Sequence, residues 1–146
     1  MIGPVLGVDP GSRRIGLAVS DALGISARPL AVVDAGGDAA EAIGTHVEEL
    51  GVKAIVVGLA VGLSGSEGDS AKRARDLAGQ LAAVTGLPVE FADERFSTAR
   101  AEELLRDRVR DRRERRKLVD AAAAAVILQG WLDAKAAQER GNPRYR

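Results

Sequence analysis

The chain has no cysteine and only one histidine, His46. The absence of cysteine excludes disulfide bonds and thiolate metal centres, and a single histidine argues against a histidine-built zinc site or a Ser-His-Asp triad. Aromatic residues make up 3% of the sequence, which is too little for a platform that stacks nucleic-acid bases. Any metal or acid–base chemistry must therefore depend on carboxylates. We expect His46 to be a partly buried structural residue and Trp131 to be a core or interface residue.

Long apolar runs are also missing. No stretch reaches the roughly 18 residues that a membrane span needs, and the N-terminus lacks the basic start and apolar core of a signal peptide. We expect a cytoplasmic protein with no membrane partner. An apolar content of 46% is sufficient for one core, so residues 1–146 are expected to form one domain. The 21 basic and 21 acidic side chains cancel, so net charge neither indicates nor excludes a nucleic-acid partner.

Apolar residues alternate or run together in five segments that predict β-strands. These segments are residues 4–9, 13–21, 28–34, 54–59 and 88–93. The segment 54–59 is apolar throughout, which is typical of a parallel strand covered on both faces. In the second segment, Gly16 and Ala18 form a face of small residues, which leaves room for a helix backbone or a ligand to approach closely.

Apolar residues at helical spacing predict helices between and after these strands. The expected helices are residues 38–50, a helix with Ala74, Leu77, Leu81 and Val84 on one face that ends at Gly86, a helix capped by Ser97 or Thr98, and residues 118–137. Residues 138–146 are expected to fray. The alternation of strands and helices predicts an α/β domain with a mixed sheet.

Acidic residues lie at the C-terminal ends of two predicted strands. Asp9 ends the first strand before Pro-Gly, and Glu94 follows the last strand beside Arg95. Strand ends in open sheets present ligand-facing groups, and Mg²⁺ prefers carboxylate oxygens, so these acids could converge on one or two ions that activate water against a phosphodiester. The alternatives are a simple turn at Asp9 and a surface ion pair at Arg95.

Asp120 is an acidic residue in an otherwise apolar segment, residues 118–128. A buried, unpaired carboxylate is costly, so this side chain must be exposed, hydrogen-bonded or metal-bound. Aspartate is also a good N-cap, and the alanine run starts directly after it. The local pattern by itself slightly favours the cap.

Positive charge is concentrated in residues 106–117, where eight basic residues stand against three acidic ones. Arginine contacts phosphates in a bidentate manner, and such contacts give affinity that depends on salt but not on base sequence. The candidate phosphate contacts in this segment are Arg112, Arg113, Arg115, Arg116 and Lys117. Arg13 and Arg14 add charge beside Asp9. The alternative for 106–117 is a solvated helix face or a mobile connection.

Four ordered motifs together resemble the YqgF (RuvX) family. They are residues 9–21 (DPGSRRIGLAVSD), 55–59 (IVVGL), 93–98 (DERFST) and 117–120 (KLVD) followed by alanines. The match covers nearly the whole chain. It departs from the family at Ala60, where the family usually has proline, and at Ser64-Gly65, where it usually has Asp-Gly. These departures concern the loop after the central strand and leave the acidic residues unchanged.

The resemblance implies an RNase H-like fold: a five-stranded mixed sheet whose first three strands are antiparallel, with helices on both faces. It implies an Mg²⁺- or Mn²⁺-dependent nuclease, either a Holliday junction resolvase or the enzyme that matures the 5′ end of pre-16S rRNA during ribosome biogenesis. By motif position, Asp9, Glu94 and Asp120 become the metal ligands and catalytic residues, which reverses the preference for a cap at Asp120.

The main hypothesis is therefore metal-dependent phosphodiester hydrolysis on structured RNA or branched DNA. Arg13, Arg14, Arg95 and the basic run would bind phosphates. One rival is a non-catalytic RNA-binding factor in ribosome assembly, and another is an ATP-binding domain related to the actin-like ATPases. The sequence leaves the choice between a monomer and a homodimer open.

Overall fold

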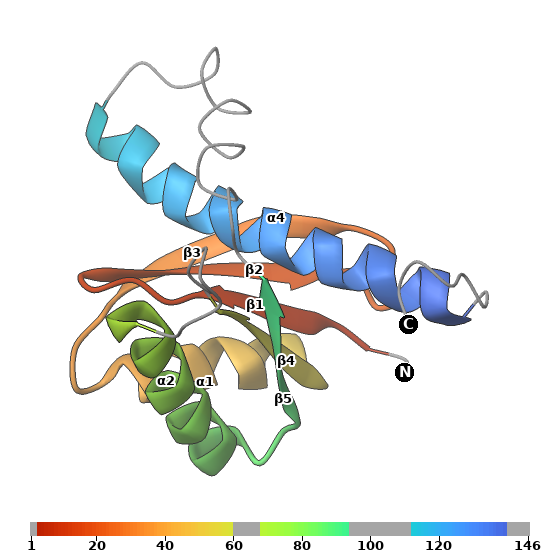
Figure 1. Cartoon of the computed structure of the whole chain (residues 1–146), viewed down its shortest axis with the longest axis horizontal. Coiled ribbons are helices and arrows are strands. Elements are labelled where there is room, and N and C mark those ends of the chain that lie inside the picture. The colour runs from red at the N-terminus through yellow and green to blue at the C-terminus, as the bar shows by residue number, and fades with distance from the viewer. Residues whose placement is uncertain (1–2, 60–67, 94–111, 140–146) are drawn as a thin grey trace.

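The computed structural model describes residues 3–59, 68–93 and 112–139. Its elements are β1 (Val5–Asp9), β2 (Arg14–Ser20), β3 (Ala27–Asp34), α1 (Ala39–Leu50), β4 (Ala54–Leu59), α2 (Asp69–Thr85), β5 (Val89–Asp93) and α4 (Arg112–Glu139). The strands form one five-stranded sheet in the order β3-β2-β1-β4-β5 (Figure 1). β1 and β2 pair antiparallel, as do β2 and β3, whereas β1–β4 and β4–β5 are parallel. The predicted mixed sheet and its antiparallel first three strands are confirmed.

Helices cover both faces of this sheet. In Figure 1, α1 and α2 lie on one face and α4 crosses the other. Strand alternation divides the apolar side chains between two cores: Leu6 and Val8 of β1 face α1 and α2, whereas Val5 faces α4. β4 contributes to both cores, through Ile55 on one face and Val56 on the other, which explains why this segment is apolar at every position.

The α4 face of the sheet contains two glycines where the helix backbone lies unusually close. A Cβ placed on Gly7 would be 2.7 Å from Leu128 Cβ and 3.1 Å from the Ala124 carbonyl oxygen. A Cβ on Gly16 would overlap the backbone carbonyl of Asp120. The sheet therefore admits α4 only because these positions have no side chain, as the small residues of the second strand predicted.

Both expected ends of the last helix are wrong, and so is the N-cap at Asp120 that the local pattern by itself favoured before the family motifs reversed it. α4 begins at Arg112 rather than at residue 118, so the second half of the basic run is helical and not a mobile connection. Arginine, lysine and glutamate are good helix formers, which allows the helix to extend through this charged segment. Asp120 is consequently inside the helix and cannot be its N-cap. At the other end the helix continues to Glu139, past the expected start of the tail.

The ends of the other helices agree more closely with expectation. α1 and α2 are followed by Gly51 (φ 66°) and Gly86 (φ 70°) in the left-handed conformation. Val84 does not share the buried face of α2, because its side chain is 47% exposed. It lies beside Gly44 of α1, which has no side chain to cover it. The helix predicted to start at Ser97 or Thr98 falls outside the described residues.

His46 is partly buried on α1 and Trp131 packs against the core under α4, so the expected burial of both residues is confirmed. Among the described residues, no helix combines the length and the apolar character needed to cross a membrane.

Replacement of Gly16 by alanine is expected to lower the free energy of unfolding by about 1–3 kcal/mol, because the new methyl group must displace the α4 backbone. Gly79→Ala is the matched control: a Cβ at this position of α2 meets no atom within 4 Å, and alanine in a helix should raise stability by up to about 1 kcal/mol. Urea unfolding followed by circular dichroism measures both. Equal stability of Gly16→Ala and the wild type would contradict the close approach.

Candidate active site

Asp9 is the last residue of β1 and is partly buried. Successive residues of a strand point to opposite faces, so Asp9 lies on the same face as Gly7, two positions earlier, which contacts α4. In the sheet, the partner of Asp9 on β2 is Gly16. Asp9 is thus placed at the carboxyl end of β1, on the face that α4 covers.

Asp120 reaches the same place from the other side. Its backbone carbonyl contacts Gly16, the residue paired with Asp9, and its side chain is 26% exposed. Two acidic residues that are far apart in the chain therefore converge over one glycine at the edge of the sheet. This convergence requires both the β1–β2 register and the close approach of α4.

Arg14, the first residue of β2, forms an ion pair with Asp120. Its Nε donates a hydrogen bond of 2.6 Å to Asp120 Oδ2, and the two side chains are 39% and 26% exposed. The bond joins the start of β2, an inner strand of the sheet, to the N-terminal third of α4. It gives Asp120 the partner that a half-buried carboxylate in an apolar segment needs.

The remaining predicted site residues are only partly described. Arg13 is exposed in the turn between β1 and β2, and its carbonyl accepts a 2.8 Å hydrogen bond from the Ala35 amide. Glu94 and Arg95 lie outside the described residues. The backbone of the predicted basic run is described from Arg112 onward, whereas the side chains of Arg112, Arg113, Arg115, Arg116 and Lys117 are not. The described residues bring together Asp9, Arg14 and Asp120, and they include no group of three acidic or histidine residues around a common point.

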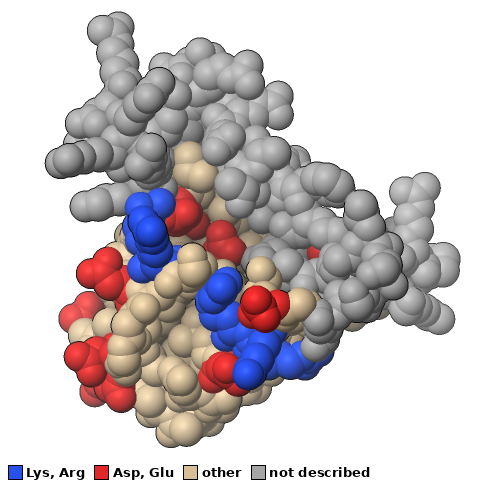
Figure 2. All heavy atoms as spheres, turned by 60° about the vertical axis from the view of Figure 1, so that its left-hand side comes forward, with Lys and Arg blue, Asp and Glu red and all other residues tan. Residues whose placement is uncertain are grey.

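Sequence reasoning missed the contribution of α2 to this end of the molecule. Lys72 and Arg73, in its first turns, line a cavity together with Pro10, Gly11 and Ser12, which directly follow Asp9. Figure 2 shows this side of the molecule, where Lys and Arg side chains lie next to Asp and Glu side chains. The only available signal was the position of these two residues directly after the glycine- and serine-rich loop.

Residues 3–134 match a protein family described as "RuvX: Holliday junction resolvase". The chain belongs to the RuvX family. The family resemblance drawn from the four motifs is confirmed, and with it membership of a nuclease family.

Curated relatives agree with this assignment. A protein of Anaeromyxobacter sp. (strain Fw109-5) is 50% identical over 132 residues, covering 89% of this chain and 96% of the relative. One from Lactococcus lactis subsp. lactis (strain IL1403) is 39% identical over 140 residues, covering 93% and 98%. Both carry the name "Putative pre-16S rRNA nuclease".

Solved structures support the fold. Thermus thermophilus RuvC in complex with a Holliday junction substrate superimposes with a TM-score of 0.57 at 19% identity, covering 96% of this chain and 97% of that one. The fowlpox virus Holliday junction resolvase gives a TM-score of 0.55 at 9% identity, covering 90% and 99%. At such low identity these similarities establish the shared RNase H-like fold of the RuvX chain and nothing finer.

The Arg14–Asp120 contact should be measurable as a coupling free energy. In a double-mutant cycle with Arg14→Gln and Asp120→Asn, we expect about 1 kcal/mol, because the bond is charged but both side chains keep access to water. The coupling should decrease between low and high salt. Urea unfolding of the wild type, both single variants and the double variant provides the measurement. Additive effects would show that the two side chains do not interact in solution.

Proposed function

We propose that this protein is a divalent-metal-dependent nuclease that hydrolyses phosphodiester bonds in the precursor of 16S ribosomal RNA. The observation that supports this most directly is the convergence of Asp9 and Asp120 over Gly16. It provides two carboxylates from distant parts of the chain at the carboxyl edge of β1, where open sheets bind ligands.

The donor set fits Mg²⁺ or Mn²⁺. Both ions prefer oxygen ligands, and Mg²⁺ is usually held by one or two carboxylates together with waters and substrate phosphates. Asp9 and Asp120 supply two such carboxylates, and Glu94, which directly follows the last residue of β5, is proposed as the third. When bound, a divalent ion supplies an activated water and stabilises the charge on the leaving oxygen.

Arg14 has a positioning role in this proposal. It holds Asp120 through Oδ2, and within the described residues Oδ1 accepts no hydrogen bond, so one oxygen is available as a ligand. The guanidinium thus fixes the rotamer of Asp120 before the cation is bound, as outer-shell partners of metal ligands commonly do. Arg13 and Arg95, together with the basic residues at the start of α4, are proposed to bind the substrate phosphates.

The substrate assignment comes from the relatives named for pre-16S rRNA. The family description names Holliday junctions instead, which makes branched DNA the second candidate. Metal ions and arginines contact phosphates in both, so the site chemistry does not choose between them. A resolvase that cuts two strands symmetrically is expected to be a homodimer, whereas a nuclease that trims one RNA end can act as a monomer.

Asp9→Asn and Asp120→Asn are expected to reduce cleavage in Mg²⁺ or Mn²⁺ by about a hundredfold or more, because each removes an anionic ligand while preserving the side-chain shape. Asp133→Asn is the matched control, since Asp133 lies exposed on the same helix and bonds only to Gln129 among the described residues. Cleavage rates with and without EDTA are compared. Full activity of Asp9→Asn would contradict the assigned site.

The two substrates are separated by a side-by-side assay of precursor 16S rRNA and a four-way DNA junction, each with metal omitted as a control. We expect cleavage of the RNA near the mature 5′ end and little cleavage of the junction. Symmetric cuts in the junction alone would select the resolvase. Salt-dependent binding of RNA without cleavage in any metal would select the non-catalytic assembly factor.

A further inference from the structure

A cavity of about 360 Å³ lies between α2 and the turn that joins β1 to β2. Ile15 and Leu77 form part of its floor, so it is on the α1–α2 face of the sheet, opposite the face that carries Asp120. Pro10, Gly11 and Ser12 form its wall on the side of the turn. The cavity therefore begins at the residue that directly follows Asp9, but it is not part of the acidic site.

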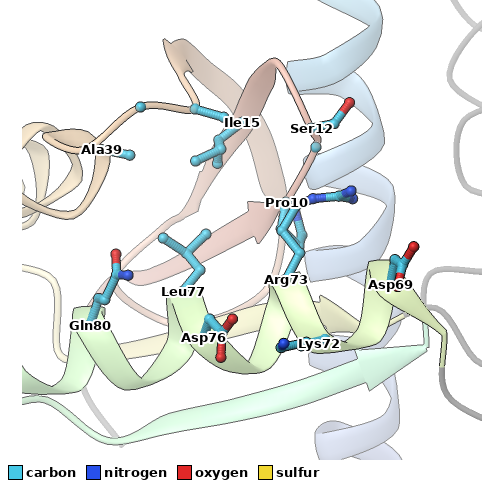
Figure 3. A pocket seen from close by; sticks show the side chains of 13 residues that line it. Pro10, Ser12, Ile15, Ala39, Asp69, Lys72, Arg73, Asp76, Leu77 and Gln80 are labelled. Atoms are coloured by element: carbon cyan, nitrogen blue, oxygen red, sulfur yellow. The ribbon is translucent and has the colours of Figure 1, made fainter.

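Two cations of α2 line this cavity. The Arg73 side chain extends from the helix toward Pro10 and the turn, as Figure 3 shows. Arg73 is partly buried, and neither it nor Lys72 has an ion pair or a side-chain hydrogen bond with any described residue. A partly desolvated guanidinium without a protein partner gains most from an external anion, and phosphate matches its planar donor geometry.

The other polar residues restrict the charge of that anion. Asp69 and Asp76 also line the cavity, so the four ionised side chains have no net charge. A free di- or triphosphate brings several negative charges close to these carboxylates and is disfavoured. A phosphodiester within a strand brings only one charge, and its flanking sugar hydroxyls can donate hydrogen bonds to carboxylates.

We propose that this cavity binds a phosphodiester of the substrate strand, next to the one that is cleaved, with Arg73 and Lys72 as its ligands. The inference rests on the proposed nuclease function and adds to it a second phosphate-binding position, on the opposite face of the sheet. Consecutive Cα atoms are about 3.8 Å apart, so Gly11 is within about 8 Å of Asp9. Along one strand of a nucleic acid, phosphates follow one another about every 3.4 Å of duplex axis. Two phosphates of the same strand can therefore lie on either side of the β1–β2 turn.

The β1–β2 turn is suited to let a nucleic-acid strand pass from the α1–α2 face of the sheet to the α4 face. A Cβ on Gly11 would overlap the backbone carbonyl of Arg14, so the two ends of the turn are in close contact and its path is fixed. Gly11 also presents no side chain to obstruct a sugar–phosphate backbone. The nucleic-acid strand would thus bind Arg73 and Lys72 on the α1–α2 side, and its next phosphate would lie near Asp9 and Asp120 on the α4 side.

The test measures binding of a fluorescein-labelled RNA hairpin with a single-stranded 5′ extension by anisotropy, in EDTA so that no cleavage occurs. The double variant Lys72→Ala/Arg73→Ala should weaken binding by about tenfold per lost contact. The slope of log K against log salt, measured from about 50 to 200 mM, should become shallower by about 0.7 for each contact. Arg73→Lys keeps the positive charge, so its slope of log K against log salt should remain close to that of the wild type.

The control is Arg28→Ala/Lys53→Ala, which removes the same charge from exposed residues at the opposite end of the strands. Its slope should equal that of the wild type. If both double variants bind RNA alike, the cavity proposal is overturned and the proposed function stands. If the wild type binds neither RNA nor a four-way DNA junction, both are overturned. ATP binding that is detected by calorimetry and lost in Lys72→Ala/Arg73→Ala would identify a mononucleotide site and overturn the strand proposal.

Discussion

The close approach of α4 to Gly7 and Gly16 is the constraint from which the arrangement of the acidic site follows. The helix can lie this close to the sheet only because neither position has a side chain, which would overlap it. Gln129, about two and a half turns beyond Asp120, also ties α4 to the β2–β3 connection, because its side chain accepts a hydrogen bond from the Ala27 amide and donates one to the Ile25 carbonyl. With the helix fixed at these points, Asp120 is held above the partner residue of Asp9.

This arrangement places the negative charge of Asp120 on the face of α4 that packs against the sheet, among buried alanines. The positive charge of Arg14 compensates it. The cation comes from the strand rather than from the helix, so the ion pair links the two elements whose relative position the site requires. The same contact leaves one carboxylate oxygen directed elsewhere. Local stability and the proposed metal binding therefore use different oxygens of a single side chain.

The β1–β2 turn separates two chemically different environments at one edge of the sheet. On the α4 face the described groups are carboxylates with one arginine, which suits a cation and the reacting phosphate. On the α1–α2 face the cavity combines two cations with two carboxylates around an apolar floor, which suits a singly charged group. Because strand alternation sends neighbouring residues to opposite faces, a few residues of one turn contribute to both environments.

The strands and the mixed sheet could be predicted from the amino-acid order, and the candidate acidic residues could be proposed from it, since both depend on local periodicity and on motifs of adjacent residues. The expected start of α4 was too late, because the charged run has high helix propensity and is part of the helix. The local pattern slightly favoured an N-cap at Asp120, since an aspartate before alanines resembles one, and the family motifs had already reversed that preference. The bond between Arg14 and Asp120, and the cavity that Lys72 and Arg73 share with the turn after Asp9, became visible only in the folded chain. These pairs are distant in the chain, and their contact depends on how α2 and α4 pack on opposite faces of the sheet, which no local pattern encodes.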